Sequence, residues 1–555
     1  MEVVFYFLVV TLGLVIWSIS AEQRQKKNLI IRLRDQWGIP PVQEYSAEKY
    51  ESLKVFYESV EDEAKDVDDI TWNDLDMDEV FELINNTQCS IGEEYLYALL
   101  RKPCFSVKEL EERDRIIQYF TTHEKERILL QTKLNFIGKF SRITVFDYLS
   151  RVDQLKPNKN LPHYLMVLSL IISIALIFVK PQVGGVLTIL CIGNNIMQYY
   201  RKKAEVEHYL SVFAFICRLL DSAKDIYQAD MPELSSYTNS LKEDCDKFKG
   251  FKRGAAFVTA KKESGNLIDM FMDYFRMLFH IDLIKFNSML SFFKANRSLF
   301  NRIFKNIGLL DSMIAVASFR EFLPYYSFPV LNNEKKRSLN VKDLFHPLIG
   351  EPVPNSIAEQ HSVLITGSNA SGKSTFIKTL AINAILSQTI YTSTSKSYQA
   401  NCFMIYSSMA LKDNLFDKES YYMVEIKSLL RILNRVNEEY PTLIFIDEVL
   451  RGTNTLERIA ASSRILSYLS KKNTMVFAAT HDIELTQILE KEYSNYHFQE
   501  RIEENEVLFD YKLYLGKAIS KNAIKLLDML KFPKEITRSA EQAAQDFLAK
   551  GEWSH

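Results

Sequence analysis

The sequence lacks the cysteine pattern of a disulfide-stabilised or zinc-binding domain. Its 555 residues include six cysteines, which lie far apart and form no CxxC pair. Disulfide-rich secreted domains are short and dense in cysteine, and zinc sites use closely spaced pairs. We therefore expect six reduced, unconnected thiols: Cys89, Cys104, Cys191, Cys217, Cys245 and Cys402.

An excess of charge of one sign is also absent. The formal net charge is −2, whereas a protein whose whole surface binds nucleic acid is strongly basic. Any such contact must come from a local patch, and the basic residues from Lys242 to Lys262 are mixed with acids. The stretch Glu58–Glu82 carries twelve acids and one base, Lys65, which predicts a solvated linker and helix face. No internal repeat is present, and the 47% hydrophobic content is typical of a globular chain with several domains.

Three long apolar runs are present. Residues Val3–Ala21 contain no charge and are long enough, as a helix, to cross a hydrocarbon core of about 30 Å. The runs Leu161–Val179 and Val183–Tyr200 are separated by three residues, which predicts a helical hairpin through a bilayer. The alternatives are a cleaved signal peptide for the first run and a buried helical pair for the other two.

The charges that flank these runs agree on one orientation. Basic residues follow the first run at Arg24–Lys27 and flank the hairpin at Lys156, Lys159 and 201–203. Because positive flanks stay on the cytoplasmic side, we expect a multi-pass protein of the cell membrane. Its N-terminus would be outside, and everything after Tyr200 would be cytoplasmic.

A phosphate-binding loop lies between residues 367 and 375. The spacing Gly367-x4-Gly372-Lys373-Ser374 matches G-x-x-x-x-G-K-[ST], after an apolar strand and before a helical run. In such a loop the backbone N–H groups surround phosphate oxygens, Lys373 reaches the β- and γ-phosphates, and the Ser374 hydroxyl binds Mg²⁺. The predicted nucleotide-binding residues are Gly367, Ser368, Asn369, Ala370, Ser371, Gly372, Lys373, Ser374 and Thr375.

Two further strands carry polar residues at their carboxyl ends, where ligands bind in an open parallel sheet. The first, Thr442–Ile446, is followed by Asp447 and Glu448. We expect Asp447 to hold Mg²⁺ and Glu448 to orient or deprotonate the attacking water. The second, Thr474–Ala479, leads to His481, which we expect to sense the γ-phosphate; a structural histidine is the alternative.

These motifs resemble those of the MutS family of DNA mismatch repair ATPases. The segments TGSNASGKST, DEVLRGTNT and AATHDIEL are similar to its nucleotide-binding motifs, and Ser420–Glu425 is similar to its signature segment. Upstream, His346–Leu348 and Val353–Asn355 also look like family segments. Taken together in the family's order, these motifs are far more specific than any one of them.

The resemblance implies a fold and an assembly. It implies an α/β P-loop ATPase domain of the ABC type after an all-α core and lever domain, with Ile84–Pro103 and Ile307–Phe319 resembling parts of that core. It also implies a homodimer that binds ATP and Mg²⁺ at a composite site, closed by Ser420 of the other subunit. The segment Gly516–Ala540 resembles the family's C-terminal dimerisation element.

The chain also departs from the family's pattern. Ser368, Ala370 and Ser371 stand where the family usually has Pro, Met and Gly, and Glu457-Arg458 stands where Asp-Gly is common. The family's mismatch-reading domain carries a Phe-x-Glu wedge. Phe56-Tyr57-Glu58 fits it in letters, but the residues before the core are too few for that domain, so we interpret Phe56 as linker.

The predicted organisation is a transmembrane anchor (1–21), an acidic linker (22–70), a helical core (71–160 and 201–335) interrupted by a transmembrane hairpin (161–200), and the ATPase domain with dimerisation helices (336–555). The leading functional hypothesis is a membrane-anchored MutS-like ATPase associated with mismatched or branched DNA. The alternative is a nucleotide-driven membrane sensor or remodelling ATPase that binds no DNA. A third reading is a nucleotide-gated scaffold with little turnover.

Overall fold

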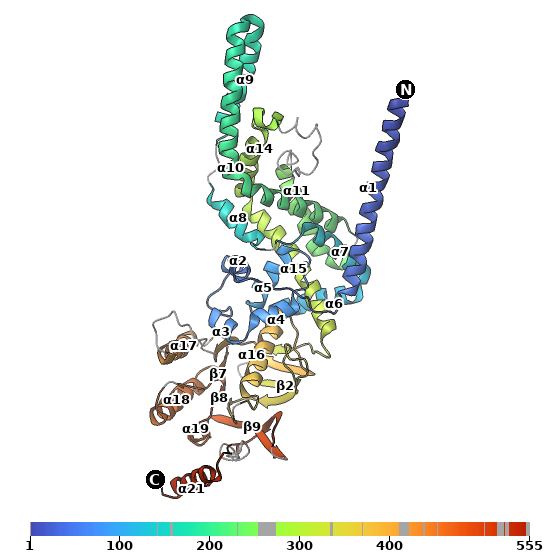
Figure 1. Cartoon of the computed structure of the whole chain (residues 1–555). Helices are drawn as coiled ribbons and strands as arrows, with labels where there is room; N and C mark the ends of the chain where they lie inside the picture. Colours follow the sequence, from blue (N-terminus) through green and yellow to red (C-terminus); the bar gives the residue numbers. More distant parts are fainter. Residues whose placement is uncertain are drawn as a thin grey trace. The chain divides into compact units, whose positions relative to one another are not determined.

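The computed structural model describes residues 2–550, except 141, 156–158, 230, 253–273, 334–336, 369, 410–420, 437–438, 452, 504–505, 519–526 and 528–531. The chain divides into two compact units, each built from three stretches (Figure 1). Unit 1 comprises Met1–Val60, Ile84–Ala98 and Arg115–Phe322. Unit 2 comprises Glu61–Leu83, Leu99–Asp114 and Leu323–His555.

Unit 1 is helical throughout its described part, as the sequence predicts for the core. Its longest buried helix, α15, begins just after α14 and is enclosed by apolar side chains over most of its length. The helices wholly or partly in unit 1 are α1 (Glu2–Asp35), α2 (Ala47–Glu58), α5 (Ser90–Leu100), α6 (Val107–Thr122), α7 (Glu124–Ile137), α8 (Val145–Gln154), α9 (Leu161–Val179), α10 (Pro181–Gln228), η1 (Pro232–Leu234), α11 (Ser235–Lys252), α14 (Ile281–Ala295) and α15 (Arg297–Phe322).

Phe56 belongs to the core of unit 1, so its interpretation as linker is wrong. It is buried in α2, and its ring centroid lies 4.8 Å from that of Phe304 and 5.1 Å from that of Phe146. Aromatic rings at such distances pack favourably, and a buried ring contributes a large apolar area. Neither a solvated linker nor an exposed wedge describes this residue.

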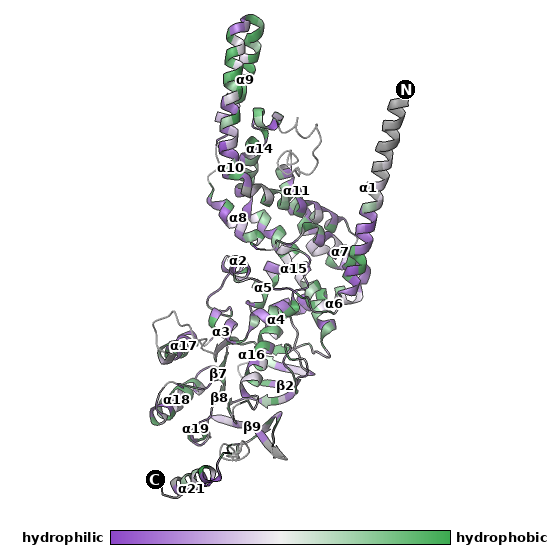
Figure 2. Ribbon diagram, in the orientation of Figure 1, coloured by the Kyte–Doolittle hydropathy of each residue, from purple (hydrophilic) through white to green (hydrophobic). Residues whose placement is uncertain are grey.

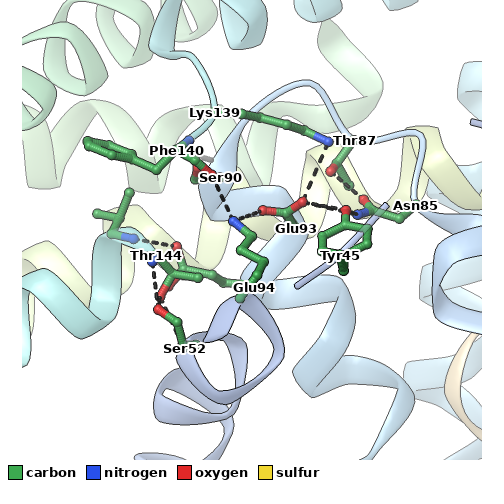
Figure 3. A network of polar contacts seen from close by, with 12 residues as sticks. Tyr45, Ser52, Asn85, Thr87, Ser90, Glu93, Glu94, Lys139, Phe140 and Thr144 are labelled. Carbon is green, nitrogen blue, oxygen red and sulfur yellow. Dashed lines mark hydrogen bonds and ion pairs between the residues drawn. The ribbon is translucent and has the colours of Figure 1, made fainter. Parts of the chain in front are cut away.

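A buried polar network connects α2, α5 and α8 (Figure 3). The Lys49 ammonium lies 2.6 Å from the Glu93 carboxylate, which also accepts a 2.6 Å hydrogen bond from the Tyr45 hydroxyl. Glu94, the next residue on α5, accepts the backbone N–H groups of Val145 and Phe146 at the start of α8. Buried polar groups must be paired, so this network fixes how the three helices fit together.

One described helix, α9, is long and apolar enough to cross a membrane. Three spans were expected, so that count is not supported. The first predicted span lies in α1, where most side chains before Ser20 are outside the described residues. The third forms the start of the 48-residue α10, whose Asn194, Asn195 and Gln198 make it less apolar than α9.

The helices α9 and α10 nevertheless pack side by side as an antiparallel pair, as the hairpin prediction requires (Figure 1). Polar side chains meet between them: the Thr188 hydroxyl donates to Ser173 at 3.2 Å. Apolar side chains face outward instead, and the ribbon of α9 is mostly hydrophobic in Figure 2. The exposed ones include Leu161, Leu165, Leu168, Ile171, Ile172, Phe178, Val183, Val186, Ile189 and Leu190.

Unit 2 contains a six-stranded sheet in the order β10-β9-β4-β8-β7-β6, in which only β10 is antiparallel to its neighbour. Its strands β4, β7 and β8 are apolar and almost completely buried, as expected for a parallel sheet covered on both faces. The bounds are β4 (Ser362–Thr366), β6 (Met404–Ser408), β7 (Thr442–Asp447), β8 (Thr474–Ala479), β9 (Tyr493–Glu503) and β10 (Glu506–Leu515).

A four-stranded sheet and several helices complete the described part of unit 2. The second sheet has the order β1-β5-β2-β3, with β1 (Val330–Asn332), β2 (Leu339–Leu344), β3 (Asn355–Glu359) and β5 (Ser397–Asn401). The main helices are α16 (Lys373–Thr389), α17 (Tyr421–Arg435), α18 (Thr455–Ser470), α19 (Ile483–Ile488) and α21 (Lys534–Lys550), with α3 described next. This architecture agrees with the predicted α/β ATPase domain.

Part of the acidic stretch Glu58–Glu82 is structured, so the expectation of a solvated linker is wrong there. It forms α3 (Asp69–Asp74) and most of α4 (Met77–Ile84), and Asp68 caps α3 by accepting the Thr71 N–H at 2.9 Å. The buried Asp74 carboxylate accepts the Ser407 hydroxyl at 2.7 Å and the Met409 N–H at 2.9 Å. These acids therefore hold α3 against the end of β6.

Candidate functional site

The predicted phosphate loop connects β4 to α16, the strand–loop–helix arrangement that its sequence requires. Gly367 and Gly372 have φ values of 146° and 109°, which favour glycine. A Cβ on Gly367 would lie 2.7 Å from the Phe498 carbonyl oxygen, so a side chain does not fit. Ser374 and Thr375 are exposed on the first turn of α16, where the helix N-terminus favours an anion.

The Lys373 side chain folds back onto the phosphate loop. Its ammonium donates to the carbonyl oxygens of Gly367 and Ser368, both at 2.8 Å. Burial lowers the pKa of Lys373, and the charges of Asp447 and Glu448 act in the opposite direction. The Lys373 ammonium is thus fixed against the loop backbone, where the β- and γ-phosphates of a nucleotide would bind.

The sheet brings the three other predicted residues to the same edge. In the register, Asp447 at the end of β7 pairs with Ala479 at the end of β8, two residues before His481. The His481 imidazole lies 3.0 Å from the Glu448 carboxylate through Nε2. This hydrogen bond, together with the nearby Arg451, keeps the pKa of Glu448 below its ordinary value. Glu448 is therefore ionised at neutral pH and bonded to His481.

Arg451 is a residue that the sequence interpretation did not single out. Its guanidinium Nε lies 2.6 Å from Glu448, and its Nη2 lies 3.7 Å from Asp447. The Arg451 guanidinium therefore contacts both acidic side chains. It does so at the edge of the sheet where Mg²⁺ and the nucleotide phosphates would bind. Its place in the resembling segment DEVLRGTNT was the only sequence signal.

A second overlooked residue, Glu425, supports this edge from α17. Its carboxylate accepts the backbone N–H groups of Leu450 and Arg451, in the turn that follows Glu448. Glu448 and Leu450 both have positive φ values, 59° and 61°, which cost energy for residues other than glycine. Glu425 therefore positions a strained turn, and burial raises the pKa of its carboxyl.

One departure from the family's pattern has a structural explanation. Arg458, in α18, makes a bidentate ion pair with Asp482 at 2.9 and 2.6 Å. Asp482 follows His481 directly, so the pair attaches the start of α18 to the end of β8. Bidentate arginine–carboxylate pairs are strong and directional. Arg458 thus adds a restraint beside the site.

A small cavity of about 210 Å³ opens beside the loop. Gly372, Thr375 and Phe376 form one wall, and the rings of Phe498 and Tyr511 and the side chain of His346 line it further out. Burial lowers the pKa of His346 to about 4, so this imidazole is neutral at physiological pH. A cavity of aromatic rings next to a phosphate loop suits a nucleobase.

Some predicted residues are outside the described part of the chain. Asn369 and Ser420 are among them, as is most of the predicted dimerisation segment Gly516–Ala540. Their roles stay predictions. The other predicted residues lie in the β4–α16 loop or, for Lys373, Ser374 and Thr375, in the first turn of α16. The Ser368 hydroxyl donates to Glu500 at 2.6 Å.

The residues present fit a nucleotide with Mg²⁺ better than a metal cage made by protein alone. Within the described ranges, no group of three or more His, Cys, Asp or Glu side chains is arranged to hold a metal. Mg²⁺ is usually bound by one or two carboxylates together with substrate phosphates. Asp447 and the exposed Ser374 supply that smaller set.

Comparison with known proteins agrees with this geometry. Residues 363–548 match the family MutS domain V. The chain is 30% identical over 212 residues to the DNA mismatch repair protein MutS of Thermus aquaticus, a match that covers 37% of this chain and 26% of the relative. It is 30% identical over 261 residues to MutS of Leptospira interrogans serovar Lai, covering 44% and 30%.

A third relative is the DNA mismatch repair protein MSH3 of Candida albicans, 27% identical over 298 residues, with 48% of this chain and 28% of the relative covered. The chain thus spans less than a third of the length of these relatives. The shared part contains the phosphate loop, Asp447, Glu448 and His481. By its domain V and the arrangement of these residues, the chain belongs to the MutS family.

Proposed function

We propose that the chain binds and hydrolyses ATP with Mg²⁺ at the loop between β4 and α16. The observation that carries this proposal is the meeting of Lys373 with Asp447 and Glu448 at one edge of a parallel sheet. Phosphoryl transfer needs mainly positioning and charge neutralisation, which such a set provides.

The chain's residues divide this work. The backbone N–H groups of the loop and Lys373 bind the phosphates, while the cavity beside Phe498 and Tyr511 accepts the base. Asp447 and Ser374 would hold Mg²⁺, which neutralises charge on the transferred phosphoryl group. Glu448, ionised and oriented by His481, accepts a proton from the attacking water. Arg451 pairs with both carboxylates and offsets part of their negative charge.

The composite dimer is the finer part of this proposal and rests on the family resemblance. In that arrangement α17 of one subunit presents its N-terminus, with Ser420, to the γ-phosphate in the other. The described part of α17 already contacts the site within its own chain, because Glu425 holds the turn after Glu448. A movement of α17 on dimerisation would therefore reach the catalytic carboxylate.

DNA is the expected macromolecular ligand, since the relatives are named as DNA mismatch repair proteins. A second function is favoured by a specific observation: the exposed apolar side chains of α9 form a surface that water does not solvate well. We therefore propose that α9, with the facing start of α10, anchors the chain in the cell membrane. The ATPase domain then lies in the cytoplasm, where ATP is present.

Nucleotide binding by the full chain tests the central claim. Lys373→Ala should abolish ATP binding in calorimetry, because the buried ammonium is the loop's own cation, whereas the exposed Lys471→Ala should bind as the wild type does. Glu448→Ala should bind ATP but hydrolyse it at least about 100-fold more slowly and accumulate as a dimer. ATP binding that persists in Lys373→Ala would overturn the assignment, and fast turnover by Glu448→Ala monomers would overturn the composite site.

A further inference from the structure

A groove lined by lysines lies in unit 1, between α10 and α11, which run side by side (Figure 1). Its volume is about 630 Å³, within the usual range of about 300–1,000 Å³ for small-molecule sites. Leu220, Cys245 and Phe248 are buried and form its floor. The polar lining residues come from one face of each helix: Lys224, Tyr227 and Gln228 from α10, and Lys242, Asp246, Lys249 and Lys252 from α11.

The lining carries more positive than negative charge. It contains four lysines and one acid, Asp246, which leaves three positive charges. Asp246 is engaged with Lys249 at 2.9 Å, and Asp221, just outside the lining, pairs with Lys252. Two positive charges therefore remain after all these pairs are counted.

Those two charges belong to Lys224 and Lys242, one from each helix. Neither ammonium has an acidic partner or a hydrogen bond among the described residues. Like charges that face one groove repel each other, so an anion placed between them is favoured. Hydrogen-bonding groups accompany them: burial raises the pKa of Tyr227, so its hydroxyl stays protonated as a donor, and Gln228 adds an amide.

We propose that this groove binds a compact soluble polyanion that carries two or more phosphate groups. The groove is separate from the ATP site and has no part in the function proposed above.

The position and surroundings of the groove select this class of ligand. Leu220 lies 20 residues beyond Tyr200 on the same helix, about 30 Å at 1.5 Å per residue, so membrane headgroups at the end of the apolar run do not reach it. Duplex DNA needs an extended basic surface. Here Asp225 and Glu243 adjoin the two lysines in sequence and interrupt it, which favours a small ligand.

Inorganic tripolyphosphate is a suitable probe. The protein is the full chain in detergent with the substitution Lys373→Ala, which removes binding at the phosphate loop. In calorimetry we expect one tripolyphosphate per chain, with an affinity that falls as salt rises. The double charge reversal K224E/K242E should weaken binding at least about tenfold, because two charge-assisted contacts are lost. The matched control K125E/K305E makes the same change of charge at exposed lysines on α7 and α15 and should bind normally.

Absence of tripolyphosphate binding by the Lys373→Ala chain would overturn the proposal. So would an equal loss in the two double variants, because binding would then follow net charge alone. Binding of duplex DNA that depends on Lys224 and Lys242, without tripolyphosphate binding, would assign the groove to a nucleic acid and also refute it. Because the ATP site is disabled throughout, none of these results bears on ATP hydrolysis, and failure of ATP binding in the wild type leaves this test intact.

Discussion

At the scale of single residues, neighbouring charges decide what each catalytic group can do. The pKa of Glu448 lies below its ordinary value because His481 and Arg451 stabilise its negative charge, as the proposed role of a base requires. Burial lowers the pKa of Lys373, and the negative charges of Asp447 and Glu448 oppose that shift. Removal of any one of these charged side chains would therefore change the pKa of the others.

Glu94 in unit 1 shows the opposite effect, and it predicts a pH dependence of stability. Complete burial raises the pKa of Glu94 from 4.5 to about 8, although two backbone N–H groups favour its ionised form. Between these values the folded chain holds a proton that the unfolded chain releases. The contribution of Glu94 to the free energy of unfolding is therefore largest below pH 4.5 and is lost as the pH rises through about 8.

Glu94→Gln, which does not titrate, should remove that loss. The pH dependence of the free energy of unfolding should change by up to about 1.4 kcal/mol per pH unit inside the window and not outside it. Urea denaturation of the full chain at a series of pH values measures this. The exposed Glu44→Gln is the control, and an equal change in that variant would contradict the assignment to Glu94.

At the scale of elements, short helices from the N-terminal half complete the ATPase unit. The acids of α3 and its surroundings bind groups of unit 2: Asp68 caps α3, Asp74 accepts two donors at the end of β6, and Asp66 pairs with Lys102 at 2.8 Å. A run of acids usually indicates a solvated surface. Here the acidic side chains instead accept hydrogen bonds from backbone and side-chain donors of unit 2.

Removal of the Asp74 carboxylate tests this role. Asp74→Ala leaves the Ser407 hydroxyl and the Met409 N–H without their acceptor, so we expect a loss of about 2–4 kcal/mol in the free energy of unfolding. Chemical denaturation of the full chain measures it. Glu63→Ala, whose side chain is 81% exposed, should change stability by less than about 0.5 kcal/mol. Equal effects in the two variants would show that the acidic segment is solvated after all.

At the scale of the whole molecule, the chain combines a nucleotide-binding domain with an apolar helix that water does not favour. Only 17% of the most apolar window of α9 is buried, so its side chains gain little from packing within the protein. Transfer of such surface into lipid is favourable by about 25 cal/mol for each Å² removed from water. The exposed apolar surface of α9 is the observation on which the proposed membrane anchor rests.

Membrane association is expected to depend on the exposed apolar face of α9. Chain synthesised without cells in the presence of phosphatidylcholine vesicles should float with them, and Leu168→Lys with Ile172→Lys should reduce the bound fraction several-fold. Both residues are more than half exposed. The control places lysines at Leu129 and Phe136, exposed apolar residues of α7, and should float normally. A wild-type chain that stays soluble and folded would refute the membrane anchor.

DNA binding is measured separately. An affinity for DNA that falls as the salt concentration rises would support DNA as the family's ligand.

The nucleotide site could be predicted from sequence because its parts are local or follow from parallel pairing. A glycine-rich loop between a strand and a helix needs only a few consecutive residues, and Asp447, Glu448 and His481 meet because parallel strands end at one edge. Arg451 and Glu425 were missed since their partners are fixed by a turn with positive φ and by a helix distant in sequence.

Sequence by itself determined the chemistry of the phosphate loop, the alternation of strand and helix in the ATPase domain and the apolar character of α9, because each is written in consecutive residues. Only the tertiary structure decided the burial of Phe56, the pairing of the acidic segment with β6 and the presence of Lys224 and Lys242 in one groove. These three features depend on contacts between residues that lie far apart in the chain. Composition does not tell which distant residue pairs with a given charged or polar group.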